Sequence, residues 1–99
     1  MDAQLRKLAD LEIDQSYHVL GYRPINTKFG DTYIITCRFY SNDIQPEFDM
    51  FATKVITSYI SNYLPKEKFF FTVRRNATKG YTYTEIDGYK PTSSFIRLN

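Results

Sequence analysis

Residues 68–75, KFFFTVRR, place Phe69, Phe71 and Val73 at alternate positions, with Phe70, Thr72 and Arg74 between them. Alternation with a period of two, in a run rich in aromatic and β-branched residues, is typical of a strand with one buried face. NATKG, residues 76–80, follows as a turn, and residues 81–89 return as a second strand. The sequence therefore predicts a β-hairpin over residues 68–89, with Phe70 pointing away from the core.

Three more strand-like runs precede this hairpin. The first begins at Tyr17, and Gly21 and Pro24 interrupt it as a bulge or bend does, which predicts a long, curved strand. After a turn at residues 26–31, a second strand is predicted at 32–40, and a short third strand at 48–52. In the second strand the predicted core face carries Tyr33, Ile35, Cys37 and Phe39, and the opposite, mixed face carries Thr32, Ile34, Thr36, Arg38 and Tyr40.

Two segments have helical spacing. Residues 53–64 place apolar side chains on one stripe, and Pro65 ends the helix. Residues 3–11 predict a short helix, with Asp2 as N-cap and Leu5, Leu8 and Leu11 on one side. Residues 41–47 read as a loop, and 91–99 as a polar tail whose apolar patch at Phe95 and Ile96 either docks or frays.

The predicted order of elements is three strands, a helix and two strands. This order resembles that of the small OB-fold single-stranded DNA-binding proteins of cells and viruses. The resemblance covers about residues 15–90 and rests on architecture and residue placement, because the fold has no invariant sequence signature. It implies a mainly β single domain over residues 1–99: an N-terminal helical segment at 1–14, a five-stranded Greek-key barrel at 15–90 and the tail. In such barrels the loops between strands one and two and between strands four and five take part in binding oligonucleotides.

The distribution of aromatic and basic residues favours the same function. The chain is 17% aromatic, with nine Tyr and eight Phe, which is more than a small core needs. Residues 51–99 hold eight bases against three acids, so an anionic partner suits this half of the chain. Single strands are bound by rings that stack on bases and by cations that follow the phosphates. The candidate binding residues are Lys28, Phe29, Arg38, Tyr40, Arg74, Arg75, Lys79, Tyr81 and Tyr83.

Each candidate also has a structural interpretation. Lys28 and Phe29 stand at the tip of a turn where Asn and Gly alone would suffice, so they either close over nucleic acid or Phe29 packs back onto the barrel end. Tyr81 and Tyr83 share a strand face, as a stacking platform or as a cross-strand pair. Arg74 and Arg75 point to opposite faces, so at most one of them is expected to meet a phosphate from the strand.

The sequence shows no arrangement of residues that is typical of a catalytic site. His18 and Cys37 form a nucleophile pair only if their strands bring them together, and no zinc-binding cluster is present. Glu85 and Asp87 share a strand face, which leaves a metal-dependent nuclease as a distant third hypothesis. The second hypothesis is a protein-interaction or homo-oligomerisation module that uses Phe70, Tyr59 and Tyr63, or the N-terminal helix.

The expected cellular location follows from features that are missing from the sequence. A lone cysteine, and no apolar run of signal-peptide or membrane-span length, predict an intracellular protein of the nucleus or cytoplasm. We expect a non-enzymatic protein of cellular or viral DNA replication that binds single-stranded DNA in preference to RNA, with little sequence selectivity. No cofactor, metal, membrane or small-molecule substrate is expected, and homo-oligomerisation is left open.

Overall fold

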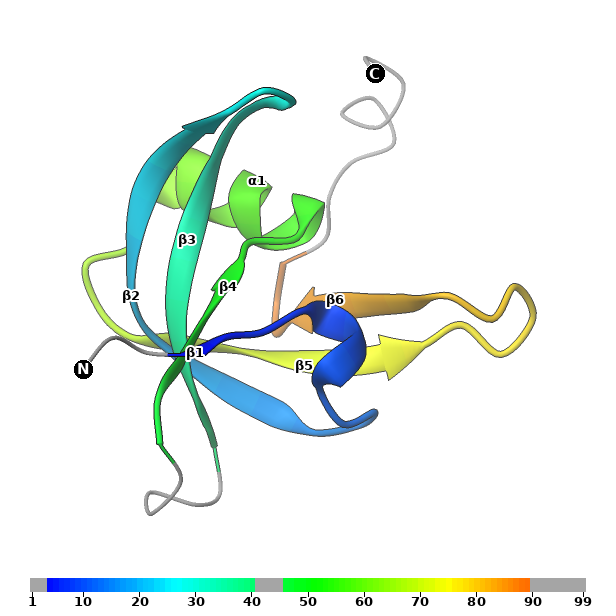
Figure 1. The fold of residues 1–99 in the computed structure, drawn as a ribbon. Helices are drawn as coiled ribbons and strands as arrows, with labels where there is room; N and C mark the ends of the chain where they lie inside the picture. The colour runs from blue at the N-terminus through cyan, green and yellow to red at the C-terminus, as the bar shows by residue number, and fades with distance from the viewer. Residues whose placement is uncertain (1–3, 41–45, 90–99) are drawn as a thin grey trace.

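The computed structural model describes residues 4–40 and 46–89, which form one twisted sheet with a helix against its inner side (Figure 1). The long strands are antiparallel to their neighbours, and the sheet order is β1-β4-β3-β2-β5-β6. The predicted mainly β class and the order of three strands, helix and two strands are confirmed. The elements are β1 (Gln4–Leu5), the 3-10 helix η1 (Leu8–Asp10), β2 (Ser16–Thr27), β3 (Gly30–Phe39), β4 (Phe48–Phe51), α1 (Lys54–Tyr63), β5 (Phe69–Arg75) and β6 (Thr82–Ile86).

The sheet is open, so the prediction of a closed barrel is wrong. Within the described residues, no strand pairing joins β4 to β6. The N-terminal segment occupies the gap instead: β1 pairs in parallel with β4, and η1 reaches β6 at the other edge. Leu11 is buried in the core and Leu8 packs against it. The apolar surface that a closing strand pair would cover is therefore covered by this segment.

The predicted N-terminal helix over residues 3–11 is also wrong. The backbone of Arg6 donates to the carbonyl of Asp49 at 2.8 Å, which continues the β1–β4 pairing and holds the chain extended. Only the single turn η1 is helical, and the Asp10 carboxylate accepts from the Lys7 N–H at 3.0 Å. Pairing with a distant strand thus overrides local helix propensity. Asp2, Phe95 and Ile96, and most of the predicted loop at 41–47, lie outside the described residues.

The predicted bulge in the first strand is confirmed. The register of β2 against β3 shifts between Val19 and Gly21, so Leu20 is the extra residue. A bulge increases the local twist of a strand, and β2 curves from the β5 side of the sheet into a long arm with β3 (Figure 1). Because of this curvature the two ends of β2 belong to different surfaces of the molecule.

The core lies between the inner face of the sheet and α1. Phe71 and Val73 of β5 and Ile35 and Cys37 of β3 are fully buried, which confirms the predicted inner faces of both strands. Ile34 is an exception, because it belongs to the opposite face and is only 8% exposed. Its pairing partners are Arg23 and Phe51, whose side chains share that face.

The helix predicted at residues 53–64 is confirmed as α1. Thr53 caps its N-terminus by accepting the Ile56 N–H at 3.3 Å. Leu64 takes a left-handed conformation at φ 44° and donates its N–H to the Ile60 carbonyl at 2.8 Å, directly before Pro65. Ile56 and Ile60 enter the core, while Tyr59 packs against Phe69 and Tyr89.

Cys37 is expected to resist alkylation in the folded protein. Burial, with a smaller effect of the Asp49 carboxylate, raises the pKa of its thiol, and the thiolate is the reactive form. Iodoacetamide at pH 8 should modify the native chain at a negligible rate and the urea-unfolded chain completely, as mass spectrometry would show. Phe29→Cys is the matched control, because a thiol at that exposed position should react at once. Rapid loss of both thiols in the native variant would contradict the burial of Cys37.

Candidate nucleic-acid interface

Three aromatic side chains meet on the outer face of the sheet, the face turned away from α1 and the core. His18 of β2 is paired with Arg38 of β3 on one side and with Phe70 of β5 on the other, so all three point to this face. The Tyr40 ring, just past the end of β3, lies 5.0 Å from the His18 ring and 5.5 Å from the Phe70 ring, centroid to centroid. We call His18, Tyr40 and Phe70 the aromatic cluster.

The cluster is open to solvent. Tyr40 is 51% exposed and Phe70 is 38% exposed, and the planes of the two rings differ by 37°. Tyr40 is held in place by its backbone, whose N–H donates to the Ser16 carbonyl at 3.0 Å. Large exposed rings that are positioned by a sheet provide the flat apolar surface on which an unpaired base stacks.

Arg38 supplies positive charge beside the cluster. Its guanidinium lies 3.9 Å from the Glu47 carboxylate, and both side chains are partly exposed. Surface ion pairs of this length contribute little to stability, so exchanging the carboxylate for a phosphate would cost little. Of the predicted site residues, the structure therefore brings Arg38 and Tyr40 together.

A second group of predicted residues follows the β5–β6 hairpin. Arg74 is paired with Tyr83 and therefore shares its face, and the rings of Tyr83 and Tyr81 lie 5.9 Å apart. Tyr81 is 51% exposed. Tyr81, just before β6, thus contacts Tyr83 of that strand on the same outer face as the aromatic cluster.

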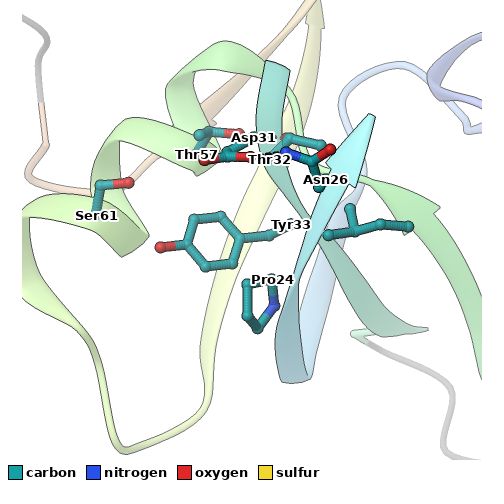
Figure 2. A pocket seen from close by; sticks show the side chains of 8 residues that line it. Pro24, Asn26, Asp31, Thr32, Tyr33, Thr57 and Ser61 are labelled. Atoms are coloured by element: carbon teal, nitrogen blue, oxygen red, sulfur yellow. Dashed lines mark hydrogen bonds between the residues drawn. The ribbon is translucent and has the colours of Figure 1, made fainter. Parts of the chain in front are cut away.

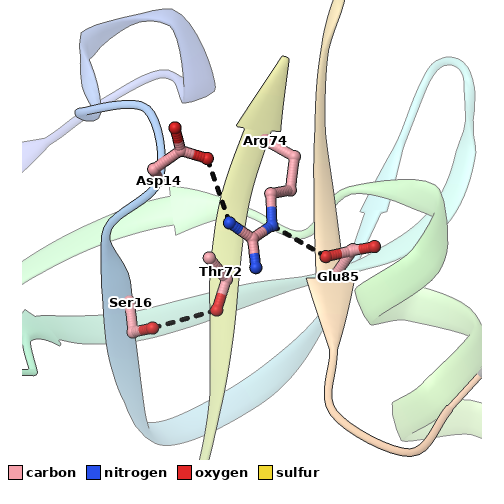
Figure 3. A network of polar contacts seen from close by, with 5 residues as sticks. All are labelled: Asp14, Ser16, Thr72, Arg74 and Glu85. Atoms are coloured by element: carbon pink, nitrogen blue, oxygen red, sulfur yellow. Dashed lines mark hydrogen bonds and ion pairs between the residues drawn. The ribbon is translucent and has the colours of Figure 1, made fainter. Parts of the chain in front are cut away.

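Arg74 is engaged by acids of its own chain. Its Nε donates to Glu85 at 2.9 Å and its Nη1 to Asp14 at 3.0 Å, as Figure 3 shows. These hydrogen bonds, first that of Glu85 and then that of Asp14, raise the pKa of the guanidinium. Beside them the hydroxyls of Ser16 and Thr72 are bonded at 2.9 Å. Arg74 thus connects β5, β6 and the segment before β2, and its charge is largely compensated.

Arg75 and Lys79 are exposed at the end of the same hairpin. Arg75 is paired with Thr82 and points to the face opposite Arg74, as alternation predicts. Lys79 lies in the turn, which the Asn76 side chain shapes by accepting the N–H groups of Thr78 at 3.0 Å and Lys79 at 2.8 Å. Within the described residues neither cation makes an ion pair.

Lys28 and Phe29 form a separate group at the tip of the β2–β3 hairpin. Phe29 is 90% exposed, so the alternative that it packs back onto the barrel end is wrong. The Lys28 Nζ lies 5.2 Å from the centroid of its ring. From Phe29 to Tyr40 the chain is almost all strand, roughly 35 Å long at about 3.3 Å per residue. The β2–β3 and β5–β6 hairpins also extend in different directions (Figure 1), so the predicted residues form separate groups.

Three residues of the outer face were not predicted as binding residues. His18 belongs to the aromatic cluster. The sequence signal for it was its position between the core residues Tyr17 and Val19, because alternation then points His18 outward. Phe51 is 45% exposed and lies opposite Ile34, whose other partner is Arg23. The Arg23 guanidinium, 3.9 Å from Asp49, adds a second cation to this face, with Ile34 between Arg23 and Phe51.

The described residues do not bring His18 and Cys37 together as a nucleophile pair. His18 lies on the outer face, whereas the Cys37 thiol is buried on the inner face, so the two side chains point to opposite sides of the sheet. Glu85 is bonded to Arg74. Among residues 4–40 and 46–89, no three His, Cys, Asp or Glu side chains gather as a metal site would require. In the same ranges, no helix has the length and apolar character to cross a membrane.

Comparisons with known proteins add no family to this description. A scan of family models finds no match, and no curated protein or solved structure is significantly similar to the chain.

Proposed function

We propose that the chain is a non-enzymatic protein that binds single-stranded nucleic acid, DNA in preference to RNA, with little sequence selectivity. The observation that carries this proposal is the aromatic cluster: the exposed rings of Tyr40 and Phe70 lie beside His18, which is paired with Arg38. Stacking on aromatic rings contributes about 1–3 kcal/mol per base and tolerates every base, because each has a π-face. Arg38 would then contact the backbone of the same strand.

We further propose that the sheet is an open form of the OB-fold. Its five antiparallel strands follow the order β4-β3-β2-β5-β6, with α1 between the third and the fourth of them along the chain. The OB-fold is a partly open five-stranded barrel whose second and third strands bind oligonucleotides. Here those strands are β3 and β4, which carry Arg38 and Phe51 on the outer face and lead to Tyr40.

Tyr81, Tyr83 and Lys79 extend the proposed path along the β5–β6 hairpin. Both tyrosines share the outer face with Phe70, and Phe70 and Arg74 are four residues apart on β5, about 13 Å at 3.3 Å per residue. Ser16, Thr72 and the compensated Arg74 lie in between. We therefore propose two stacking positions with a polar stretch between them.

The test is a fluorescence anisotropy titration of a labelled oligothymidine at several salt concentrations. Binding should weaken as salt rises, since each neutralised phosphate contributes about 0.7 to the slope of log K against log salt for a single strand. Lys79→Ala should reduce the slope by about 0.7, the contribution of one phosphate contact. Tyr83→Ala should lower the affinity roughly fivefold or more and leave the slope unchanged, because the lost contact is stacking.

The proposal fails if the wild-type chain shows no binding to oligothymidine at low salt. A hairpin of duplex DNA with the same label is the control, and it should bind more weakly, because its bases are already stacked. An oligouridine of equal length tests the preference for DNA.

A second candidate, a protein-interaction module, is favoured by a different surface. On α1, Tyr63 is 62% exposed and Leu64, just beyond it, is 63% exposed, next to the ring contacts of Tyr59 and Tyr89. Exposed apolar groups that adjoin each other suit a protein interface. Sedimentation would identify this function by a homodimer that is insensitive to salt.

A further inference from the structure

We infer that a cleft between the β2–β3 hairpin and α1 binds a single nucleotide, either free or at the end of a strand. Two adjoining cavities of about 490 and 380 Å³ form this cleft, and they share Asp31, Thr32, Thr57 and Ser61. The hydroxyls of Thr32 and Thr57, bonded at 3.2 Å, lie between the hairpin and the helix. Volumes of this size match the usual range for small-molecule sites, about 300–1,000 Å³.

The lining of the cleft suits the sugar and the base edge of a nucleotide. Figure 2 shows the Tyr33 ring pointing from the hairpin toward α1, where Ser61 and Thr57 present hydroxyl groups. The Asn26 amide donates to the Asp31 carboxylate, so that carboxylate is oriented at the rim. Hydroxyl, amide and carboxylate groups supply the donors and acceptors that a ribose and a base edge require.

The mouth of the cleft suits the base face and the phosphate. Phe29 and Lys54 line the second cavity, together with Asn62. The Phe29 ring is 90% exposed, and the Lys28 Nζ lies 5.2 Å above it. A ring on which a base can stack, next to two lysines for a phosphate, repeats in one place the combination that binds single strands. This arrangement gives a function to the otherwise costly Lys28 and Phe29 of a short turn.

The cleft is distinct from the outer face, because it faces α1 whereas the aromatic cluster points away from it. Its occupancy by a free nucleotide is independent of the function proposed above, and only its occupancy by a strand end rests on that function. The two ligands share one chemistry: a base, a pentose and a phosphate. A titration with competition distinguishes the free nucleotide from the strand end.

The experiment is a ¹⁵N NMR titration of the whole chain with thymidine 5′-monophosphate at low salt. We expect the amide signals of Thr32, Thr57 and Ser61 to shift, and to saturate at a lower nucleotide concentration than those of His18 and Phe70. Phe29→Ala and Lys54→Ala should each lower the affinity for the nucleotide about tenfold, because each removes a stacked base or a phosphate contact. Leu5→Ala, which removes a 59% exposed apolar side chain on β1 that lines neither cavity, is the control and should leave the nucleotide affinity unchanged.

A competing oligothymidine with a 5′-phosphate then identifies the source of the ligand. Release of bound thymidine 5′-monophosphate, followed by its own ³¹P signal, while the cleft stays occupied supports a strand end, and retention of the nucleotide supports a free nucleotide. Absence of shifts in the cleft at millimolar nucleotide overturns the inference, as does an affinity that neither Phe29→Ala nor Lys54→Ala changes. If the cleft shifts occur while oligothymidine does not bind the outer face, the proposed function fails and the cleft site stands.

Discussion

Replacing Phe71 with alanine is expected to lower the free energy of unfolding by about 3–5 kcal/mol. Phe71 is fully buried, and its ring stacks on Tyr17 with the centroids 5.7 Å apart. It pairs with Tyr17 of β2 and with Ile86 of β6, so its removal opens a cavity where three strands meet. Since small domains are stable by only about 5–15 kcal/mol, this loss takes a large share of the total.

The neighbouring residue provides the control. Phe70→Ala removes the same side chain from a position that is 38% exposed on the outer face, so we expect a loss of about 1 kcal/mol, in keeping with partial burial. Urea unfolding followed by circular dichroism measures both variants under the same conditions. Equal losses for the two variants would contradict the assignment of Phe71 to the core and Phe70 to the surface.

The sequence contained enough information to predict the hairpin at residues 68–89 and the helix α1. Both depend on periodicity within one segment: Phe71 and Val73 alternate with outward residues, and Ile56 and Ile60 recur at helical spacing. Their boundaries were also readable locally, because Thr53 caps the helix and Pro65 follows it. Such signals need no knowledge of the rest of the chain.

Features that depend on distant pairing could not be predicted in this way. The apolar spacing of residues 3–11 is compatible with a helix, and only the presence of a free β4 edge makes the extended form of β1 the better choice. The same pairing explains why the sheet stays open, since the N-terminal segment covers the core between its edges. Local propensity is a weak predictor where tertiary hydrogen bonds compete with it.

The candidate site has the same limits. Alternation predicted that Arg38, Tyr40 and Phe70 face outward, but not that β2 lies between their strands and adds His18 to them. Arg74 was a candidate binding residue, but the sequence did not show that Asp14, sixty residues earlier in the chain, pairs with it. The outward direction of a side chain can thus be read from a sequence, while its neighbours across the sheet cannot.

The affinity of the double variant Tyr40→Ala/Phe70→Ala for oligothymidine is expected to be lower than that of the wild type by up to about 100-fold. Each ring offers a stacking surface worth about 1–3 kcal/mol, and both lie within contact distance of His18. Because the two rings are only 5.5 Å apart, the single substitutions should not be additive, and the double-mutant cycle should give a coupling of about 0.5 kcal/mol or more. The slope of affinity against salt should stay that of the wild type, since no phosphate contact is removed.

Tyr63→Ala is the matched control for this measurement, because Tyr63 is a 62% exposed tyrosine on α1, away from the outer face. It should leave the affinity for oligothymidine unchanged. If the double variant binds as tightly as the wild type while Tyr63→Ala weakens binding, the strand contacts the helix side of the molecule and the aromatic cluster is not the interface. If the double variant loses affinity and keeps the salt slope, stacking on the outer face accounts for the binding, since a defect in charge would change that slope.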